Sequence, residues 1–386
     1  MNFDSLLLNY AAFIESAITD RFVKHNVVEQ LLEQLPSDFR VETKGYSEEG
    51  RSLNLVTWGR GKCKIFLWSQ MHGNEATGTM SLFDLINFLK DPAQQETADT
   101  IADECTLYML PMVNPDGAER FIRRNANQID INRDFIDTLT KEAKVLRNLR
   151  DEINPDYAFN LHDQDTLWSV QGSLKSATLS YLAPSYDENS SVNETRTRAM
   201  QVVADIFETL TNFLPGRIGL FQDEFEPRAF GDNFQLAGTS TLLLESGGFK
   251  EDDEKQEIRK YFFISILKGL LSIATGSFKE KNVVQYQDIP KNNKQIFHVL
   301  IQNVAVNGLT TSIGLNYEDA FNPSDLTVKR TYYIKDIGDL RYCNAYTTYE
   351  GSKLTINGFI LIDSLATLDL FEKDRRILSF SYGILV

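Results

Sequence analysis

The sequence predicts an α/β domain followed by a small, β-rich C-terminal domain, and three observations support this prediction. Between residues 40 and 275, short apolar runs typical of strands alternate with stretches of helical periodicity. After Gly276, short β-rich runs follow one another. Charge changes at the same place: residues 276 to 386 hold 12 Lys and Arg against 12 Asp and Glu, so the formal net charge of -15 lies in residues 1 to 275.

These changes divide the chain into three expected parts. Residues 1–39 form a helical segment packed on the α/β domain, residues 40–277 form that domain, and residues 278–386 form the β-rich domain. A chain of 386 residues exceeds the size at which a single hydrophobic core usually stops growing, which agrees with more than one domain.

The elements expected before residue 276 follow from periodicity and turn residues. Apolar residues at helical spacing from Leu6 to Leu35 predict one or two helices that end at Pro36. The next elements are a hairpin over Val41–Thr57, a strand over Lys64–Trp68, a helix over Thr77–Leu89, strands over Leu107–Val113, Tyr157–Leu161 and Thr241–Leu244, and a helix over Lys255–Ala274. In the C-terminal domain we expect strands over Ile296–Val306, Lys329–Ile334, Lys353–Ile362 and Ile377–Val386.

Composition excludes several classes of function. A net charge of -15 argues against a nucleic-acid partner and against anionic membranes, because both need a basic surface. No stretch offers the 18 or so uninterrupted apolar residues of a membrane helix, and the N-terminus resembles no export signal. The three cysteines are widely spaced, which suits buried free thiols in a reducing compartment. We therefore expect a cytoplasmic protein.

Four side chains that can bind or serve a metal stand at the ends of apolar strands. His72 and Glu75 follow the strand at Lys64–Trp68, His162 follows Leu161, and Glu245 follows Leu244. Open α/β sheets place ligand sites at the carboxyl ends of their strands. Two imidazoles and a carboxylate suit zinc with an open position, and a further carboxylate can transfer protons.

Each of these residues also has a structural interpretation. A His-x-x-Glu pair on a helix can be a surface hydrogen bond, and Glu245 can cap the next helix or pair with an arginine. The other two histidines, His25 and His298, lack such neighbours and are interpreted as ordinary helix and strand residues.

A polar block lies between the two histidine sites. It contains a turn at Asn114-Pro115-Asp116-Gly117, then Arg123-Arg124-Asn125-Ala126-Asn127 and Asp130-Ile131-Asn132-Arg133-Asp134-Phe135. These stretches can be a turn and a solvated loop. They also supply a cation for a developing oxyanion and an arginine fork beside an amide, the groups that bind a carboxylate.

Together, the His-x-x-Glu pair, the polar block, His162 and Glu245 resemble the zinc carboxypeptidase (funnelin) family in residue type and order. The resemblance covers roughly residues 40 to 275. It implies a three-layer α/β/α sandwich with a mixed eight-stranded sheet and one zinc ion, and it says nothing about the β-rich domain.

The resemblance also implies roles. His72, Glu75 and His162 would ligate zinc, with a water in the open position. Glu245 would accept a proton from that water and return it to the leaving amine. Arg123 best matches the arginine that stabilises the oxyanion, with Arg124 as the alternative.

Substrate binding is expected from the same block and from a stretch before Glu245. Asn132 and Arg133 match the pair that grips the terminal carboxylate of a peptide. The family's specificity pocket maps to a stretch that includes Arg228, which can bind an acidic group of the substrate or pair with a nearby acid. The mobile tyrosine of digestive members has no counterpart in Gly219–Glu226. We therefore expect a small, carboxylate-bearing peptide, such as a cell-wall fragment.

Two other functions stay open. The chain also resembles N-acyl amino acid deacylases of the succinylglutamate desuccinylase and aspartoacylase type, which share His-Gly-Asn-Glu and carry a C-terminal β domain. The substrate is thus a small peptide or an N-acyl amino acid. A metal-free binding module without activity is the alternative of another class. The sequence does not predict the oligomeric state.

Overall fold

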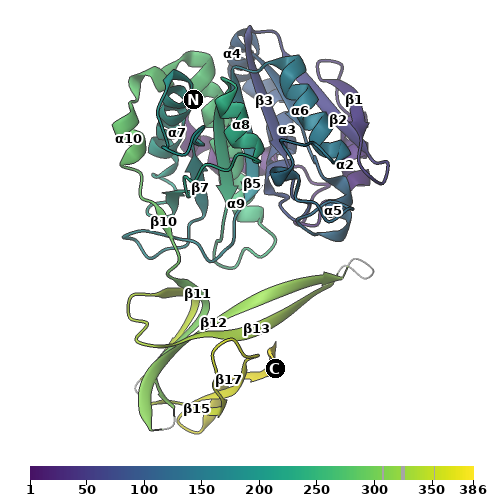
Figure 1. Ribbon diagram of the computed structural model, residues 1–386. Helices are drawn as coiled ribbons and strands as arrows, with labels where there is room; N and C mark the ends of the chain where they lie inside the picture. Colours follow the sequence, from purple (N-terminus) through teal and green to yellow (C-terminus); the bar gives the residue numbers. More distant parts are fainter. Residues whose placement is uncertain (307, 323–326, 352) are drawn as a thin grey trace. The chain divides into compact units, whose positions relative to one another are not determined.

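The computed structural model describes residues 1–306, 308–322, 327–351 and 353–386, which divide into two compact units (Figure 1). Unit 1 comprises Met1–Thr166 and Ala177–Asn292. Unit 2 comprises Leu167–Ser176 and Asn293–Val386. In the part of the chain that the structure describes, no helix combines the length and the apolar character needed to span a bilayer.

Unit 1 is built on one mixed sheet with the strand order β1-β2-β4-β3-β5-β9-β7-β8. The four strands β4, β3, β5 and β9 are parallel neighbours, whereas β1, β2 and β7 enter through antiparallel pairings. The strands are β1 (Arg40–Tyr46), β2 (Ser52–Gly59), β3 (Cys63–Ser69), β4 (Cys105–Leu110), β5 (Tyr157–Asp163), β7 (Leu179–Leu182), β8 (Ile218–Leu220) and β9 (Ser240–Ser246).

Helices cover both faces of this sheet because its central strands are apolar on both sides. In β3, Ile65 and Leu67 point into one core while Phe66 and Trp68 point into the other, and all four are fully buried. The first face carries α3 (Thr77–Lys90), α4 (Gln95–Glu104), α7 (Glu194–Leu210), α9 (Gln256–Thr275) and the N-terminal α1 (Phe3–Leu8), η1 (Tyr10–Ala12) and α2 (His25–Glu33). The second carries α6 (Lys141–Ile153) and α8 (Phe230–Leu236).

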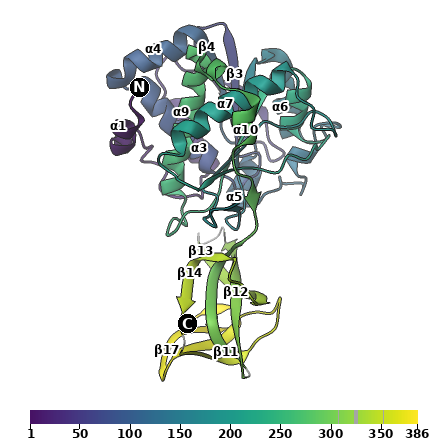
Figure 2. The same ribbon diagram turned by 90° about the vertical axis from the view of Figure 1, so that its left-hand side faces the viewer.

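Viewed from the side, α3, α4 and α9 lie opposite α6 (Figure 2). The predicted three-layer α/β/α sandwich with eight strands is therefore confirmed. The remaining short elements of unit 1 are η2 (Pro92–Gln94), α5 (Pro115–Arg120), η3 (Ile131–Arg133), η4 (Ser277–Glu280) and α10 (Val283–Gln287).

Unit 2 is a β structure with its own core, formed by residues such as Ile301, Ile313, Leu315 and Leu370. Seven of its strands follow the order β13-β12-β11-β15-β16-β17-β18, and β14 pairs with β11. They are β11 (Ile296–Val306), β12 (Leu309–Asn322), β13 (Thr327–Gly338), β14 (Asn344–Glu350), β15 (Leu354–Phe359), β16 (Thr367–Glu372), β17 (Arg375–Ser381) and β18 (Ile384–Leu385). The short β6 (Ser169–Val170) pairs with β10 (Asn292–Asn293). The predicted β-rich C-terminal region is confirmed.

The N-terminal segment contains two helices, α1 and α2, as predicted. Residues 13 to 24 between them are not helical, because Arg259 binds the carbonyls of Glu15 and Ile18. Two other local predictions are wrong. The run from 377 to 386 is two strands, since the chain turns at Gly383 with φ +81°. Of the three free cysteines only Cys105 is buried.

Candidate functional site

The three predicted metal ligands come together at the carboxyl ends of β3 and β5. Nδ1 of His72 lies 2.8 Å from Oε1 of Glu75, and Nδ1 of His162 lies 2.7 Å from Oε2 of the same carboxylate. All three residues are buried. Because β3 and β5 are parallel neighbours, residues that follow their ends meet at one edge of the sheet.

The loop that carries His72 packs directly on the start of α5, and the turn at Asn114 explains why. The Asn114 side chain caps α5 by accepting a hydrogen bond from the Gly117 amide at 2.9 Å, and Pro115 occupies the first helical turn. A Cβ atom on Gly73 would lie 2.1 Å from the carbonyl carbon of Gly117. Glycine is therefore required between His72 and Glu75 for the two backbones to approach.

Electrostatics favours an ionised Glu75 between the two imidazoles. Burial alone would raise the pKa of Glu75, but His72 and His162 outweigh it and hold the pKa well below its usual range. Burial lowers the pKa of His162, against the pull of Glu75. For His72 the opposite balance holds, because Glu75 and Asp130 outweigh burial and raise its pKa.

This arrangement fits a metal ion. One ligand atom from each of His72, Glu75 and His162 lies within 4.8 Å of the others. Two imidazole nitrogens and one carboxylate oxygen are a donor set that zinc accepts, with room for a fourth ligand. The structure thus supplies a buried cluster that can hold a metal.

Glu245 stands next to this cluster without a partner. It is paired in register with His162 across β5 and β9. Its Oε2 atom is buried and makes no hydrogen bond within the described residues, so neither a helix cap nor an arginine accounts for it. Burial, and then the negative charges of Glu75 and Asp163, raise its pKa well above the ordinary value. A carboxyl with a raised pKa is a better proton acceptor once it is ionised.

The two candidate arginines of the polar block, Arg123 and Arg124, have different hydrogen-bond partners. Nη1 of Arg123 lies 3.1 Å from Oε1 of Glu75 and 3.1 Å from Nδ1 of His72. Arg124 instead donates to the carbonyl of Gln128 at 2.9 Å. Arg123 is therefore at the cluster, and the side-chain bond of Arg124 is to the adjoining loop.

The candidate carboxylate-binding residues sit on η3 and on the turn before α8. Asn132 accepts a hydrogen bond from the Phe230 amide at 3.0 Å. Arg133 and Arg228 both contact one carboxylate of the protein, that of Glu226, at 3.1 Å and 2.7 Å. Arg228 thus pairs with a nearby acid, and that acid is Glu226.

Two acidic residues at the site were not singled out from the sequence. Oδ1 of Asp130 lies 3.1 Å from Nε2 of His72, and Asp130 also pairs with Arg123. Asp163 accepts hydrogen bonds from Thr77 and Ser246, while its amide donates to Glu75. Asp163 could have been found from its position directly after the candidate ligand His162. The position of Asp130 in the sequence does not indicate its contact with His72.

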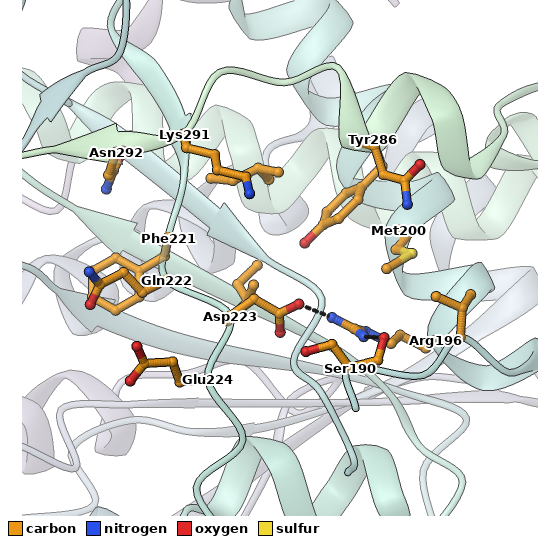
Figure 3. A pocket seen from close by; sticks show the side chains of 14 residues that line it. Ser190, Arg196, Met200, Phe221, Gln222, Asp223, Glu224, Tyr286, Lys291 and Asn292 are labelled. Atoms are coloured by element: carbon orange, nitrogen blue, oxygen red, sulfur yellow. Dashed lines mark hydrogen bonds and ion pairs between the residues drawn. The ribbon is translucent and has the colours of Figure 1, made fainter. Parts of the chain in front are cut away.

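A cavity of about 730 Å³ lies in unit 1, away from the candidate site residues. It is lined by residues from β7, β8, α7 and α10 and by the segment 221–224 that leads towards Glu226 (Figure 3). None of the predicted site residues lines it. Within it, the buried Arg196 binds Asp223 at 2.5 Å.

Comparisons with known proteins agree with this geometry. Residues 25–208 match the family described as zinc carboxypeptidase. The chain is 30% identical over 127 residues to carboxypeptidase 2 of Trichophyton tonsurans, an alignment that covers 30% of this chain and 23% of that protein. The chain thus spans less than a quarter of that relative's length.

Solved structures show the same fold. A metallo-carboxypeptidase from Burkholderia cenocepacia aligns with a TM-score of 0.52 at 18% identity, covering 66% of this chain and 69% of the other. Bovine thrombin-activatable fibrinolysis inhibitor, solved with a tick carboxypeptidase inhibitor, gives a TM-score of 0.54 at 14% identity, covering 69% of this chain and 100% of the other. Residues 25–208 are thus similar in sequence to the zinc carboxypeptidase family, and the solved structures show that unit 1 shares the fold of metallo-carboxypeptidases.

Proposed function

We propose that the protein is a zinc-dependent metallocarboxypeptidase that hydrolyses the C-terminal amide bond of a small, carboxylate-bearing peptide. The observation that carries this proposal is the convergence of His72, Glu75 and His162 beside an unpartnered Glu245. Such a group of buried, partly unsatisfied titratable residues is what a catalytic centre requires.

Each residue has a defined task in this proposal. His72, Glu75 and His162 hold one zinc ion, which, when bound, lowers the pKa of a water ligand to about 7 and polarises a carbonyl. Glu245 takes the proton of the attacking water and returns it to the leaving amine. Arg123, whose guanidinium lies 3.1 Å from Glu75, supplies positive charge for the oxyanion.

Selection of the C-terminal bond rests on η3. Arg133 and Asn132 are adjacent and follow Asp130, whose carboxylate contacts His72, so a carboxylate gripped there sits near the cluster. Arg133 offers the fork that matches a carboxylate, and the Nδ2 group of Asn132 has no acceptor among the described residues.

We also propose a cytoplasmic location, since the three cysteines are free thiols.

The test is the hydrolysis of short peptides by zinc-loaded protein, comparing the parent chain with Glu245→Gln. We expect the substitution to lower kcat by about 10²–10⁴-fold, the usual contribution of a general base, while the zinc content stays the same. Glu251→Gln is the matched control, because Glu251 is an exposed acid that follows the same strand.

Two outcomes would reject the proposal. Hydrolysis of N-acetyl amino acids but not of peptides would identify a deacylase instead. Protein that binds no zinc and hydrolyses neither class would be a binding module.

A further inference from the structure

The carboxylate of Glu226 joins two arginines that the proposed function places at the substrate. Its Oε2 atom lies 3.1 Å from Nε of Arg133 and 2.7 Å from Nη2 of Arg228. Its Oε1 atom accepts hydrogen bonds from Nε and from the backbone amide of Arg228, at 2.8 and 3.1 Å. Two guanidinium groups are thus held side by side by one anion.

Arg228 donates three hydrogen bonds to Glu226, two to Oε1 and one to Oε2, and Arg133 adds an ion pair at Oε2. The bonds from Arg228, and then the charge of Arg133, lower the pKa of Glu226 to about 2, so it is ionised at neutral pH. Because its charge is already paired with two guanidiniums, Glu226 offers little attraction to a cationic group of a substrate.

The net charge of the cluster favours binding of an anion over binding of a cation. It carries two positive charges and one negative charge, and a guanidinium has five N–H groups, of which these contacts use a minority. Arg133 and Arg228 are 38% and 55% exposed in their side chains, against 25% for Glu226. Solvent, and hence a ligand, can reach both guanidiniums.

The chain around Glu226 is anchored from both sides, which makes the cluster a preformed site. On the N-terminal side, Asp223 is bound by the buried Arg196 at 2.5 Å (Figure 3). The Ser185 hydroxyl also donates to Asp223, at 2.6 Å. At Glu226 itself, the backbone amide donates to Asp232 at 3.0 Å.

The C-terminal side is tied to the segment that carries Arg133. The Phe230 amide donates to the Asn132 side chain at 3.0 Å, and the Phe135 amide donates to the Arg228 carbonyl at 3.2 Å. The backbone positions of Arg133 and Arg228 are therefore fixed relative to each other, and Glu226 fixes their side chains.

We propose that Glu226 is a positioning residue that holds Arg228 beside Arg133, so that the two guanidiniums together select a C-terminal residue with two carboxylates. This inference rests on the proposed function, in which Arg133 binds the terminal carboxylate. Arg228 then binds the second carboxylate, such as that of an acidic side chain, and bidentate pairing makes this recognition specific.

The experiment measures calorimetric binding of L-glutamate and of L-glutamine to the zinc-loaded full chain, which requires no turnover. The two ligands differ in one carboxylate, so their affinity ratio isolates its recognition. We expect the parent protein to bind glutamate about tenfold to hundredfold more tightly, the range for one added charge-assisted pair. Arg228→Gln should bring the ratio close to one, while glutamine binding stays unchanged.

The Glu226→Asp variant tests whether the position of this carboxylate matters in addition to its charge. Aspartate keeps the negative charge but is one methylene shorter, so it cannot bridge both guanidiniums, and we expect the ratio to fall severalfold. The matched control is Arg341→Gln, which removes an exposed arginine held in the same way by Asp339, and it should leave the ratio unchanged.

The outcomes decide between the two proposals. Equal binding of the two ligands by the parent, or no binding of either, overturns the inference, and so does a Glu226→Asp variant with the parental ratio. Peptide hydrolysis, measured in parallel on peptides ending in glutamate or glutamine, tests the proposed function alone. An enzyme that cleaves both peptides equally keeps that function and loses this inference.

Discussion

Oδ1 of Asp130 lies 3.1 Å from Nε2 of His72, on the ring edge opposite the one that faces Glu75. The same carboxylate pairs with Arg123 and caps η3 by accepting the Asn132 amide at 3.0 Å. Through these three contacts, Asp130 links a candidate metal ligand, the candidate oxyanion arginine and the candidate carboxylate-binding turn. Such outer partners set the tautomer and the orientation of a metal-binding histidine.

Asp130→Asn should weaken zinc binding by about 10–100-fold without unfolding the protein, because the amide is a poorer acceptor for the Nε2–H group of His72. Competition with a chelator of known affinity measures the effect. Asp137→Asn, an exposed site on the loop that follows η3, is the control. An unchanged zinc affinity in Asp130→Asn would mean that the orientation of His72 depends on Glu75 alone.

Arg123→Ala and Arg124→Ala form a second, paired prediction. Arg123 reaches Glu75 and His72, so its loss should lower kcat by about 10²–10³-fold with little change in KM. Arg124 bonds to the Gln128 carbonyl, so its loss should leave kcat within twofold, about the limit of such assays. Steady-state kinetics on one peptide decides, and the reverse ranking of the two variants would refute the assignment.

The layers of the fold could be predicted from the sequence because periodicity reports burial directly. β3 is apolar on both faces, and α3 spans Thr77–Lys90 against an expectation of Thr77–Leu89. The segment between residues 13 and 24 could not be predicted, since its backbone carbonyls bond to Arg259, more than 200 residues away. The sequence around these residues contains no signal for a partner so far away in the chain.

For the candidate site, the strand-end positions of His72, His162 and Glu245 were enough to predict their proximity. Arg123 and Arg124 are adjacent and of one type, so only the structure separates them. Asp130 and Glu226 act through contacts with His72 and with Arg133, and neither spacing nor residue type marks those contacts. Contacts of this kind can be identified only in the folded structure.

Asp232→Asn should stabilise the protein, and increasingly so as pH rises from about 4 to about 7. Burial raises the pKa of Asp232 to about 7, above its value of about 4 in an unfolded chain. Over this range the unfolded state loses its proton first, so the native aspartate becomes a growing cost that levels off above pH 7. Asparagine removes that cost.

We expect a gain of about 1–2 kcal/mol at pH 8 and almost none at pH 4, allowing for relaxation around the charge. Urea unfolding at the two pH values measures it, with the exposed Asp38→Asn as control. A difference between Asp232→Asn and parent that does not change with pH would show that the pKa of Asp232 is the same in the folded and unfolded states.

Arg259→Met should cost about 3–5 kcal/mol of stability, the penalty for leaving one member of a buried ion pair alone. Arg259 and Asp84 are fully buried and contact each other at 2.6 Å, and Asp84 also binds the Tyr10 hydroxyl. Methionine fills a similar volume without charge, so the loss measures the stranded Asp84 together with the carbonyls that Arg259 binds. Urea unfolding gives the magnitude.

The neighbouring Lys260→Met provides the contrast. Lys260 is half-buried and pairs with the exposed Glu257, so the substitution should cost no more than about 0.5 kcal/mol. Hydrogen exchange adds a local readout: amides between residues 10 and 18 should lose protection in Arg259→Met and keep it in Lys260→Met. If that segment stays protected in both variants, the N-terminal part is held by its apolar contacts, such as those of Phe13 with Phe88, and not by the ion pair.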